Sequence, residues 1–229
     1  MADEIRIISS MATRQVLADL TALFQQQVSQ RVSAESVGGV DAAKRVHAGE
    51  AFDVVVLAAG VIDQLTQAGR IVPGSRVDLV RSGVSIAVRS GAPRPDIGSE
   101  EAVKRAVIAA RSLSYSTGPS GVHLVKLFER WGITQQIQGR IVQAPPGVPV
   151  GTLVATGQVE LGFQQLSELI HLSGIDVLGP LPPEIQTITT FSAGLSITST
   201  QGEAVRALLA FMASPAADGP KLNNGMDPA

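Results

Sequence analysis

The segment Leu113-Ser-Tyr-Ser-Thr-Gly-Pro-Ser-Gly-Val-His123 is the most informative stretch of this chain. Its first three residues predict a short strand, the small polar residues predict a turn, and a helix is expected from about Ser120 to about Trp131. Such a turn presents free backbone N–H groups and hydroxyls where the helix dipole is positive, which favours an anion. We therefore predict ligand contacts here, with simple helix capping as the alternative, from Ser116, Thr117, Ser120 and Gly121.

Two further turns of this kind occur nearer the N-terminus. Ser9, Ser10 and Met11 follow the first predicted strand, and Gly38 and Gly39 precede a predicted helix. Both serines also have a plain interpretation as helix N-caps. Three such turns in one chain predict a cleft for a small, polar, anionic ligand.

Composition restricts the class of protein. The chain has 229 residues, is 45% hydrophobic and 17% charged, and has a formal net charge of -2. These values are typical of a well-buried α/β core, and the lack of a basic excess argues against nucleic acid as a partner. The chain has no cysteine, which excludes disulfides, a thiolate nucleophile and a cysteine metal site.

Targeting signals are not evident. The N-terminal residues Met1-Ala-Asp-Glu-Ile5 contain neither a basic nor an apolar leader region, and no apolar run reaches the length of a membrane span. We expect no membrane insertion. The expected location is cytoplasmic for the chain as it stands, and periplasmic if a leader has been removed.

Hydrophobic patterning predicts two series of alternating strands and helices. The first has strands at 5–9, 31–36 and 53–58 and helices at 11–27, 40–47 and 62–68, which favours a mostly parallel sheet with helices on both faces. A strand-like stretch at 77–88 is interrupted at residues 81–83. The second series has helices at 100–110, 121–131 and 150–156 and strands at 113–115, 140–142 and 161–164. It is followed by strands at 175–178 and 186–198 and a helix at 203–212. The polar tail, 218–229, is expected to be a short helix or an unpacked end.

Two such series predict two lobes of an α/β protein. We expect one lobe at 1–84 plus 193–229 and the other at 85–192, hinged by crossing strands at 84–90 and 187–193. In open α/β sheets the ligand lies beyond the carboxyl ends of the strands. The polar residues Ser9, Ser116 and Gln164 follow strands in this way, which places the predicted ligand cleft between the lobes.

Further polar side chains are candidates for the site. Gln164 and Gln165 end a buried apolar strand, and a buried amide needs a partner, either a ligand or a neighbouring loop. Arg81, beside Ser82, offers a forked guanidinium for a carboxylate. Its alternative is an exposed arginine at a sheet edge.

Catalytic groups are harder to assign from the sequence. His123 lies one turn into the helix at the anion turn and is a candidate general base, with packing as its alternative; Glu168 is a second candidate. The three histidines have no metal-ligand spacing, and no P-loop, HExxH motif or serine elbow is present. We expect no metal and no cofactor.

Taken together, these segments resemble type II periplasmic substrate-binding proteins, in particular the molybdate-binding-protein-like family. Ile5-Arg-Ile-Ile-Ser-Ser10 is similar to the family's first strand and ligand turn, and Ala51-Phe-Asp-Val-Val-Val56 to its buried-strand segment. Pro119-Ser-Gly-Val122 falls at the family's Pro-Ala-Gly turn. The resemblance implies two further binding segments, Pro149-Val-Gly-Thr-Leu153, which adds Val150 to the site, and Leu161-Gly-Phe-Gln-Gln165.

The site pattern departs from that of a molybdate binder. Glycines 38 and 39 lie near the family's second serine, and Gln165 lies about where its tyrosine stands. The segments Val77-Asp-Leu-Val-Arg-Ser82 and Gly179-Pro-Leu-Pro182 resemble a divergent branch that includes an aconitate isomerase.

Two functions therefore stay open. One is a binding protein for a small oxyanion or carboxylate, with an ABC transporter permease as its partner if the protein is exported. The other is a cofactor-free isomerase that moves an allylic proton of an unsaturated di- or tricarboxylate.

Overall fold

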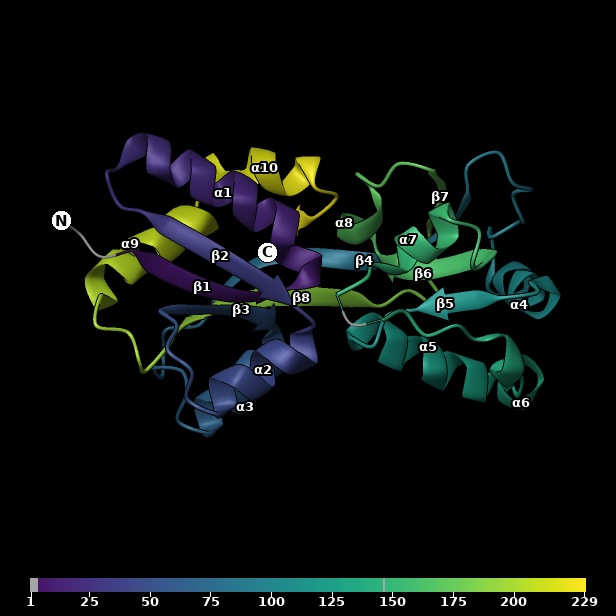
Figure 1. The fold of residues 1–229 in the computed structure, drawn as a ribbon, viewed down its shortest axis with the longest axis horizontal. Coiled ribbons are helices and arrows are strands. Elements are labelled where there is room, and N and C mark those ends of the chain that lie inside the picture. Colours follow the sequence, from purple (N-terminus) through teal and green to yellow (C-terminus); the bar gives the residue numbers. More distant parts are fainter. Residues whose placement is uncertain (1–3, 146) are drawn as a thin grey trace. The chain divides into compact units, whose positions relative to one another are not determined.

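A computed structural model describes residues 4–145 and 147–229, which form two compact units. Unit 1 contains the chain up to Ser82 and again from Thr189, and unit 2 contains Gly83–Ile188. The boundaries thus fall at 82/83 and 188/189, against 84/85 and 192/193 expected from the sequence. Figure 1 shows the elements of each unit along the chain.

In unit 1, strand β1 lies between β2 and β3 and runs parallel to both. The register pairs Ser9 with Ser36 and Ser10 with Val37. Strand β3 pairs antiparallel with β8, which is followed by β4, and β9 pairs with β4 near Arg81. These strands are β1 (Ile5–Ser10), β2 (Val32–Val37), β3 (Val54–Ala58), β4 (Val77–Arg89), β8 (Ile188–Leu195) and β9 (Asp227–Pro228).

Alternate residues of these strands face opposite sides of the sheet, as a pleated strand requires. Ile7 and Val54 belong to one hydrophobic cluster, whereas Ile8 and Val55 belong to another. Helices cover both faces in Figure 1, with α2 and α3 on the face opposite α1 and α10. The helical segments of unit 1 are η1 (Met11–Thr13), α1 (Arg14–Gln27), α2 (Gly39–His47), α3 (Ala59–Gln67), α9 (Gly202–Ala213), η3 (Pro215–Ala217) and α10 (Asp218–Asn223).

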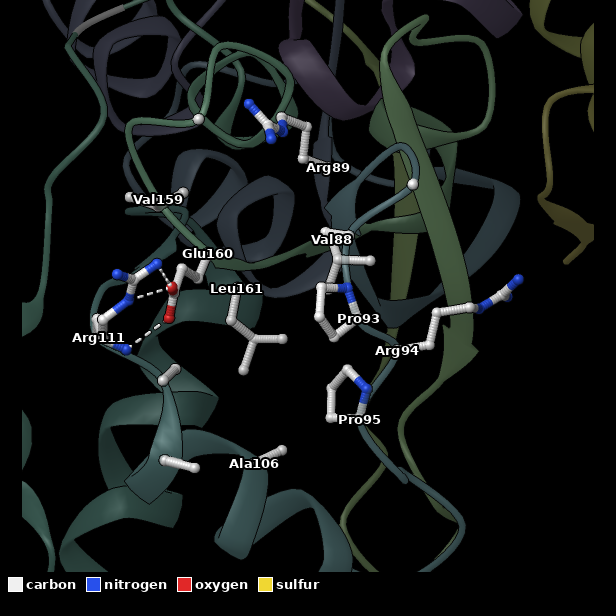
Figure 2. A pocket seen from close by; sticks show the side chains of 15 residues that line it. Val88, Arg89, Pro93, Arg94, Pro95, Ala106, Arg111, Val159, Glu160 and Leu161 are labelled. Carbon is white, nitrogen blue, oxygen red and sulfur yellow. Dashed lines mark hydrogen bonds and ion pairs between the residues drawn. The ribbon is translucent and has the colours of Figure 1, made fainter.

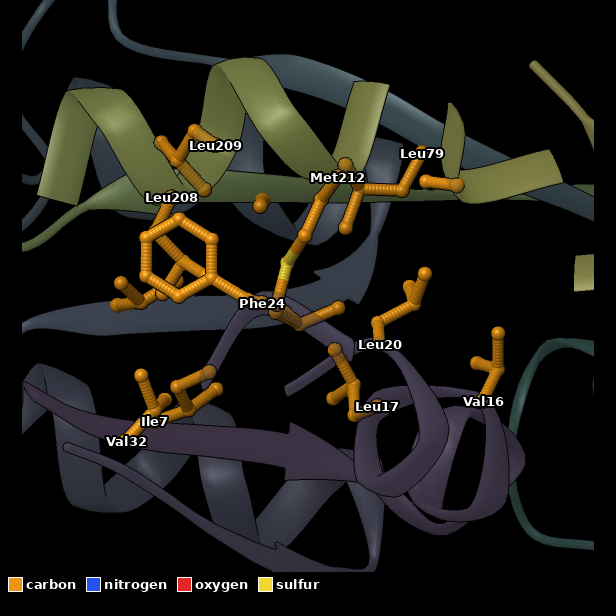
Figure 3. Packing of buried hydrophobic residues seen from close by; sticks show 14 of the residues in the cluster. Ile7, Val16, Leu17, Leu20, Phe24, Val32, Leu79, Leu208, Leu209 and Met212 are labelled. Atoms are coloured by element: carbon orange, nitrogen blue, oxygen red, sulfur yellow. The ribbon is translucent and has the colours of Figure 1, made fainter. Parts of the chain in front are cut away.

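The larger cluster of unit 1 is formed where α1 and α9 pack on the sheet. Figure 3 shows Leu20 and Phe24 of α1 facing Leu208 and Met212 of α9. Each of these side chains is at least nine-tenths buried. Burial of a side chain of this size contributes roughly 1.5–3 kcal/mol, so this contact stabilises the face of the sheet opposite α2.

In unit 2, strand β6 lies between β4 and β5, antiparallel to the first and parallel to the second. Strand β7 also pairs antiparallel with β4, with a bulge between Ile86 and Ala87. Helices α4 and α5 pack on one face, while α7 packs against β6 on the other. The elements are α4 (Glu100–Ala109), β5 (Leu113–Tyr115), α5 (Pro119–Arg130), α6 (Thr134–Ile137), η2 (Gln138–Arg140), α7 (Val150–Ala155), β6 (Leu161–Gln165), α8 (Leu166–Leu169) and β7 (Ile175–Pro180).

Two predictions of secondary structure were wrong. Strand β4 is continuous through residues 81–83, because it has strand partners on either side of them, β9 at Arg81 and β6 at Val84. The expected strand at 140–142 is reduced to one bridge, between Ile141 and Leu113, because η2 occupies Arg140. The tail is packed, with Lys221 of α10 buried.

Among the described residues, no helix is long and apolar enough to cross a membrane.

Candidate functional site

In unit 1, the serine turn follows β1 directly. Ser9 is fully buried, and its Oγ lies 2.7 Å from the Oγ of Ser36 on the neighbouring strand. The Ser9 hydroxyl therefore already has a hydrogen-bond partner within the sheet. Met11, half-buried, begins the 3-10 turn that leads into α1.

Ser10 differs from Ser9 in having a hydroxyl without a protein partner. The residue is 8% exposed, and its Oγ has no hydrogen-bond partner among the described residues. The Ser10 carbonyl accepts a hydrogen bond from the Thr13 hydroxyl at 3.1 Å. A buried hydroxyl that lacks a partner costs about 1–3 kcal/mol, so this orientation is unusual unless something else binds there.

The glycine turn lies beside Ser10. Helix α2 begins at Gly39, with Gly38 as its N-cap and no side chain capping its first turn. A Cβ atom on Gly39 would stand 3.6 Å from the Cβ of Ser10. The structure therefore brings the unpaired hydroxyl and an uncapped helix N-terminus together, which is a suitable arrangement for an anion.

In unit 2, the turn after β5 is folded tightly onto the start of α5. The hydroxyls of Ser116 and Ser120 lie 2.8 Å apart, and Thr117 is exposed. A Cβ atom on Gly121 would stand 1.6 Å from the Ser116 carbonyl oxygen, so only glycine fits there. Helix α5 starts after Gly118 without a side-chain cap.

The end of β6 forms a second polar cluster in unit 2. Gln164 is 3% exposed; its Oε1 accepts the N–H of Gly151 at 3.3 Å and its Nε2 donates to Glu168 at 2.7 Å. Burial raises the pKa of Glu168 to about 7, with the hydrogen bond from Gln164 acting in the opposite direction. Val150, the first residue of α7, and Gln165 are also buried.

Three other candidates have protein partners. The Arg81 guanidinium donates to the Pro228 carbonyl at 2.8 Å, next to the pairing of β4 with β9. Ser82 is buried. Nε2 of His123 lies 2.8 Å from the Ile185 carbonyl; because a carbonyl can only accept, Nε2 carries the proton. These contacts favour structural roles for Arg81 and His123.

One polar residue was not recognised as a candidate from the sequence. Ser114 is fully buried on β5, and its Oγ has no partner among the described residues. It pairs with Gly162 of β6 and so points to the same side of the sheet as Gln164. Because alternate residues of a strand face opposite sides of the sheet, the pattern of residues 113–115 could have shown that Ser114 faces the other side from Leu113 and Tyr115.

A concavity of about 640 Å³ lies elsewhere in unit 2 and is shown in Figure 2. Val88, Leu161 and Ala106 contribute apolar surface to it, and the Arg111 side chain forms an ion pair with Glu160. None of the predicted site residues lines it. Among the described residues there is also no cluster of three or more metal-binding side chains.

Comparison with known proteins places the chain in a class. Residues 5–227 match the family of bacterial extracellular solute-binding proteins, and the chain belongs to this family. An aconitate isomerase from a Pseudomonas species is 39% identical over 185 residues, which is 80% of this chain and 70% of that protein.

Solved structures show the same fold. The periplasmic molybdate-binding protein of Azotobacter vinelandii matches with a TM-score of 0.82 at 18% identity, covering 97% of this chain and 98% of that one. A tungstate-binding protein from Desulfovibrio alaskensis matches with a TM-score of 0.70 at 15% identity, covering 100% and 99%. The α/β fold and the resemblance to molybdate-binding-like type II proteins are thereby confirmed.

Proposed function

We propose that this protein binds a small oxyanion or carboxylate, which is held by serine hydroxyls and helix N–H groups. The observation that carries this proposal is the buried Ser10 hydroxyl, which has no hydrogen-bond partner in the described part of the chain and lies beside the uncapped start of α2. A bound anion would accept hydrogen bonds from both, and so would remove the cost of the unpaired hydroxyl.

In unit 2, the turn at the start of α5 carries groups of the same kind. Ser120 is buried at the first turn of α5, and among the described residues its hydroxyl is paired with that of Ser116. Two hydroxyls that share one hydrogen bond leave a second proton for a ligand. The proposed ligand contacts of unit 2 also include Thr117, Gly121, Val150, Gln164 and Gln165.

Ligand binding to Ser10→Ala tests this proposal. Thermal unfolding would be followed with molybdate, tungstate, sulfate, phosphate, citrate and both aconitates, because a ligand of the folded state raises the melting temperature. We expect Ser10→Ala to weaken binding of the effective ligand about tenfold or more and to raise the stability of the free protein, because the unpaired hydroxyl is removed.

The matched control is Thr134→Val. Its Oγ1, on α6, is also a buried hydroxyl with no hydrogen-bond partner within residues 4–145 and 147–229. This variant should bind like the wild type. Equal weakening by both variants, or no effect of Ser10→Ala on a ligand that does bind, would contradict the assignment.

A second candidate function is the isomerisation of an unsaturated di- or tricarboxylate. It is favoured by the 39% identity to an aconitate isomerase over most of the chain. The same anion-binding groups would hold the substrate carboxylates, and helix N–H groups would stabilise the enolate-like charge. Proton NMR of the protein mixed with cis- or trans-aconitate tests this directly, since conversion changes the vinyl signal.

A transporter permease as partner, and a periplasmic location, belong to the first candidate. They are proposals that rest on the family, whose members are extracellular solute-binding proteins. Fractionation of cells that express the full gene would test them: recovery in the periplasmic fraction is expected for a transport receptor, whereas recovery in the cytoplasm would oppose that role.

A further inference from the structure

The Glu168 carboxyl group lies close to the proposed anion-binding residues of unit 2. It belongs to α8, the short helix that directly follows β6, and the residue is partly exposed. Its Oε1 accepts a hydrogen bond of 2.7 Å from Gln164. The carboxyl therefore lies at the carboxyl end of β6, where ligands bind in α/β folds.

The orientation of Gln164 is fixed by a backbone group. The N–H of Gly151 can only donate, so the Oε1 of Gln164 must face it, at 3.3 Å. The amide nitrogen is then directed at Glu168. One oxygen of the Glu168 carboxyl is thus held in place.

Few ionisable groups surround Glu168. Helix α8 packs on β6, which has none, and on β7, which has Asp176. The Asp176 carboxylate accepts hydrogen bonds from Ser90 and Gly91, and with Arg94 it lines a concavity of about 510 Å³. His171 follows α8 in sequence.

The protonation of Glu168 follows from these surroundings. Burial is the larger cause of its raised pKa, about 7, and the hydrogen bond from Gln164 is the smaller, opposing one. Near neutral pH both the acid and the carboxylate are populated. A general acid or base is most efficient when its pKa lies near the working pH.

We propose that Glu168 is the general base and acid of an allylic proton shift, with Gln164 as its positioning residue; this rests on the isomerase candidate above. The substrate class is an unsaturated tricarboxylate whose methylene carbon is next to the double bond. No cofactor or oxidant is required, because the reaction moves one proton and one double bond.

Atoms and electrons balance in this proton shift. The Glu168 carboxylate removes a proton from the methylene carbon, and the electron pair of that C–H bond forms the new C=C bond. The electrons of the former double bond move onto the conjugated carboxylate as an enolate. Protonated Glu168 then returns the proton to the former vinyl carbon, the enolate collapses, and the carboxylate is regenerated.

Exchange of deuterium into trans-aconitate in D₂O tests this assignment. Proton NMR follows loss of the methylene signal with wild type and with Glu168→Gln, alongside thermal shifts by the same ligand. We expect the variant to bind trans-aconitate like the wild type and to exchange it at least about 100-fold more slowly. The control Glu184→Gln, at an exposed position of unit 2, should exchange normally.

A pH series adds a readout that a structural role would not change. Wild-type exchange should rise with a midpoint near pH 7, and Glu168→Asp, which keeps a displaced carboxyl, should retain slow exchange with a shifted midpoint. Normal exchange by Glu168→Gln would overturn the assignment while leaving the isomerase candidate standing. Absence of exchange by a wild type that binds trans-aconitate would overturn both, and anion binding would remain.

Discussion

At the scale of single residues, close packing decides which side chains the proposed anion turns tolerate. The start of α5 contacts the preceding turn so closely that Gly121 has no room for a side chain. A Cβ atom on Gly60, in the first turn of α3, would instead meet no other atom within 4 Å. Two glycines with similar positions in their helices should therefore respond oppositely to the same change.

Gly121→Ala should destabilise the protein by at least about 3 kcal/mol, because the Ser116 carbonyl must move away from the new methyl group. Gly60→Ala should instead stabilise it by about 0.5–1 kcal/mol, since alanine lowers the entropy of the unfolded chain. Urea unfolding measures both. A mild effect of Gly121→Ala would show that the turn is looser than the structure indicates.

The stability of the protein should depend on Glu168 in a defined pH window. Its pKa rises from 4.5 to about 7 on folding, so between these values the folded state holds a proton that the unfolded state has released. Stability should therefore fall as pH rises through the window, by up to about 3 kcal/mol. Glu168→Gln removes this dependence, and should match wild type near pH 4.5 and exceed its stability at pH 8.

Urea unfolding at pH 5 and pH 8 measures this difference, with Glu184→Gln as the control that keeps the wild-type dependence. A variant that is less stable than wild type at pH 8 would show that charged Glu168 is well solvated or paired.

At the scale of elements, the contact between α7 and β6 sets the position of Gln164. A Cβ atom on Gly162 would lie 2.5 Å from Val154 and 3.1 Å from Val150, both on α7. The helix therefore rests directly on the strand, which brings the Gly151 N–H within reach of the Gln164 amide.

Gly162→Ala should force α7 away from β6 and cost about 1–3 kcal/mol. Val154→Ala removes the nearest side-chain atom, so the double variant should be more stable than the sum of the two single changes predicts. A thermodynamic cycle from urea unfolding of the four proteins measures this coupling. Strict additivity would mean that the strand, and not the helix, accommodates the methyl group.

The sequence predicted most elements because their patterns are local. The apolar run 54–58 and the helical stripe of Val16, Leu20 and Phe24 identify β3 and α1 without further information. The continuity of β4 was missed because its partners near residues 81–84, Asp227 of β9 and Gln165 of β6, lie far along the chain. Likewise, Ser9 lies beside Ser36 of β2, which pairs with its hydroxyl, whereas Ser10 lies beside Val37, which offers no polar side chain. The sequence of β1 alone does not show this difference.

At the scale of the whole molecule, each unit has its own hydrophobic cores. The clusters of unit 2 draw only on residues between Val84 and Ile185, and those of unit 1 only on the segments either side. The order of strands and helices along the chain predicted this two-lobed organisation. The positions of the boundaries were harder to predict, because β4 and β8 run through them without a change of pattern.

The contiguous segment 83–188 should therefore fold by itself, since no residue of its cores lies outside it. A domain is expected to fold independently when its core is its own. We expect a single cooperative urea transition and dispersed amide signals in NMR spectra. The fragment should not bind the anion proposed to contact Ser10 and the start of α2, because it lacks both. A fragment that stays unfolded would show that unit 1 supplies stability through β4 and β8. A fragment that binds this anion with full affinity would contradict the assignment of Ser10 and α2 to the site.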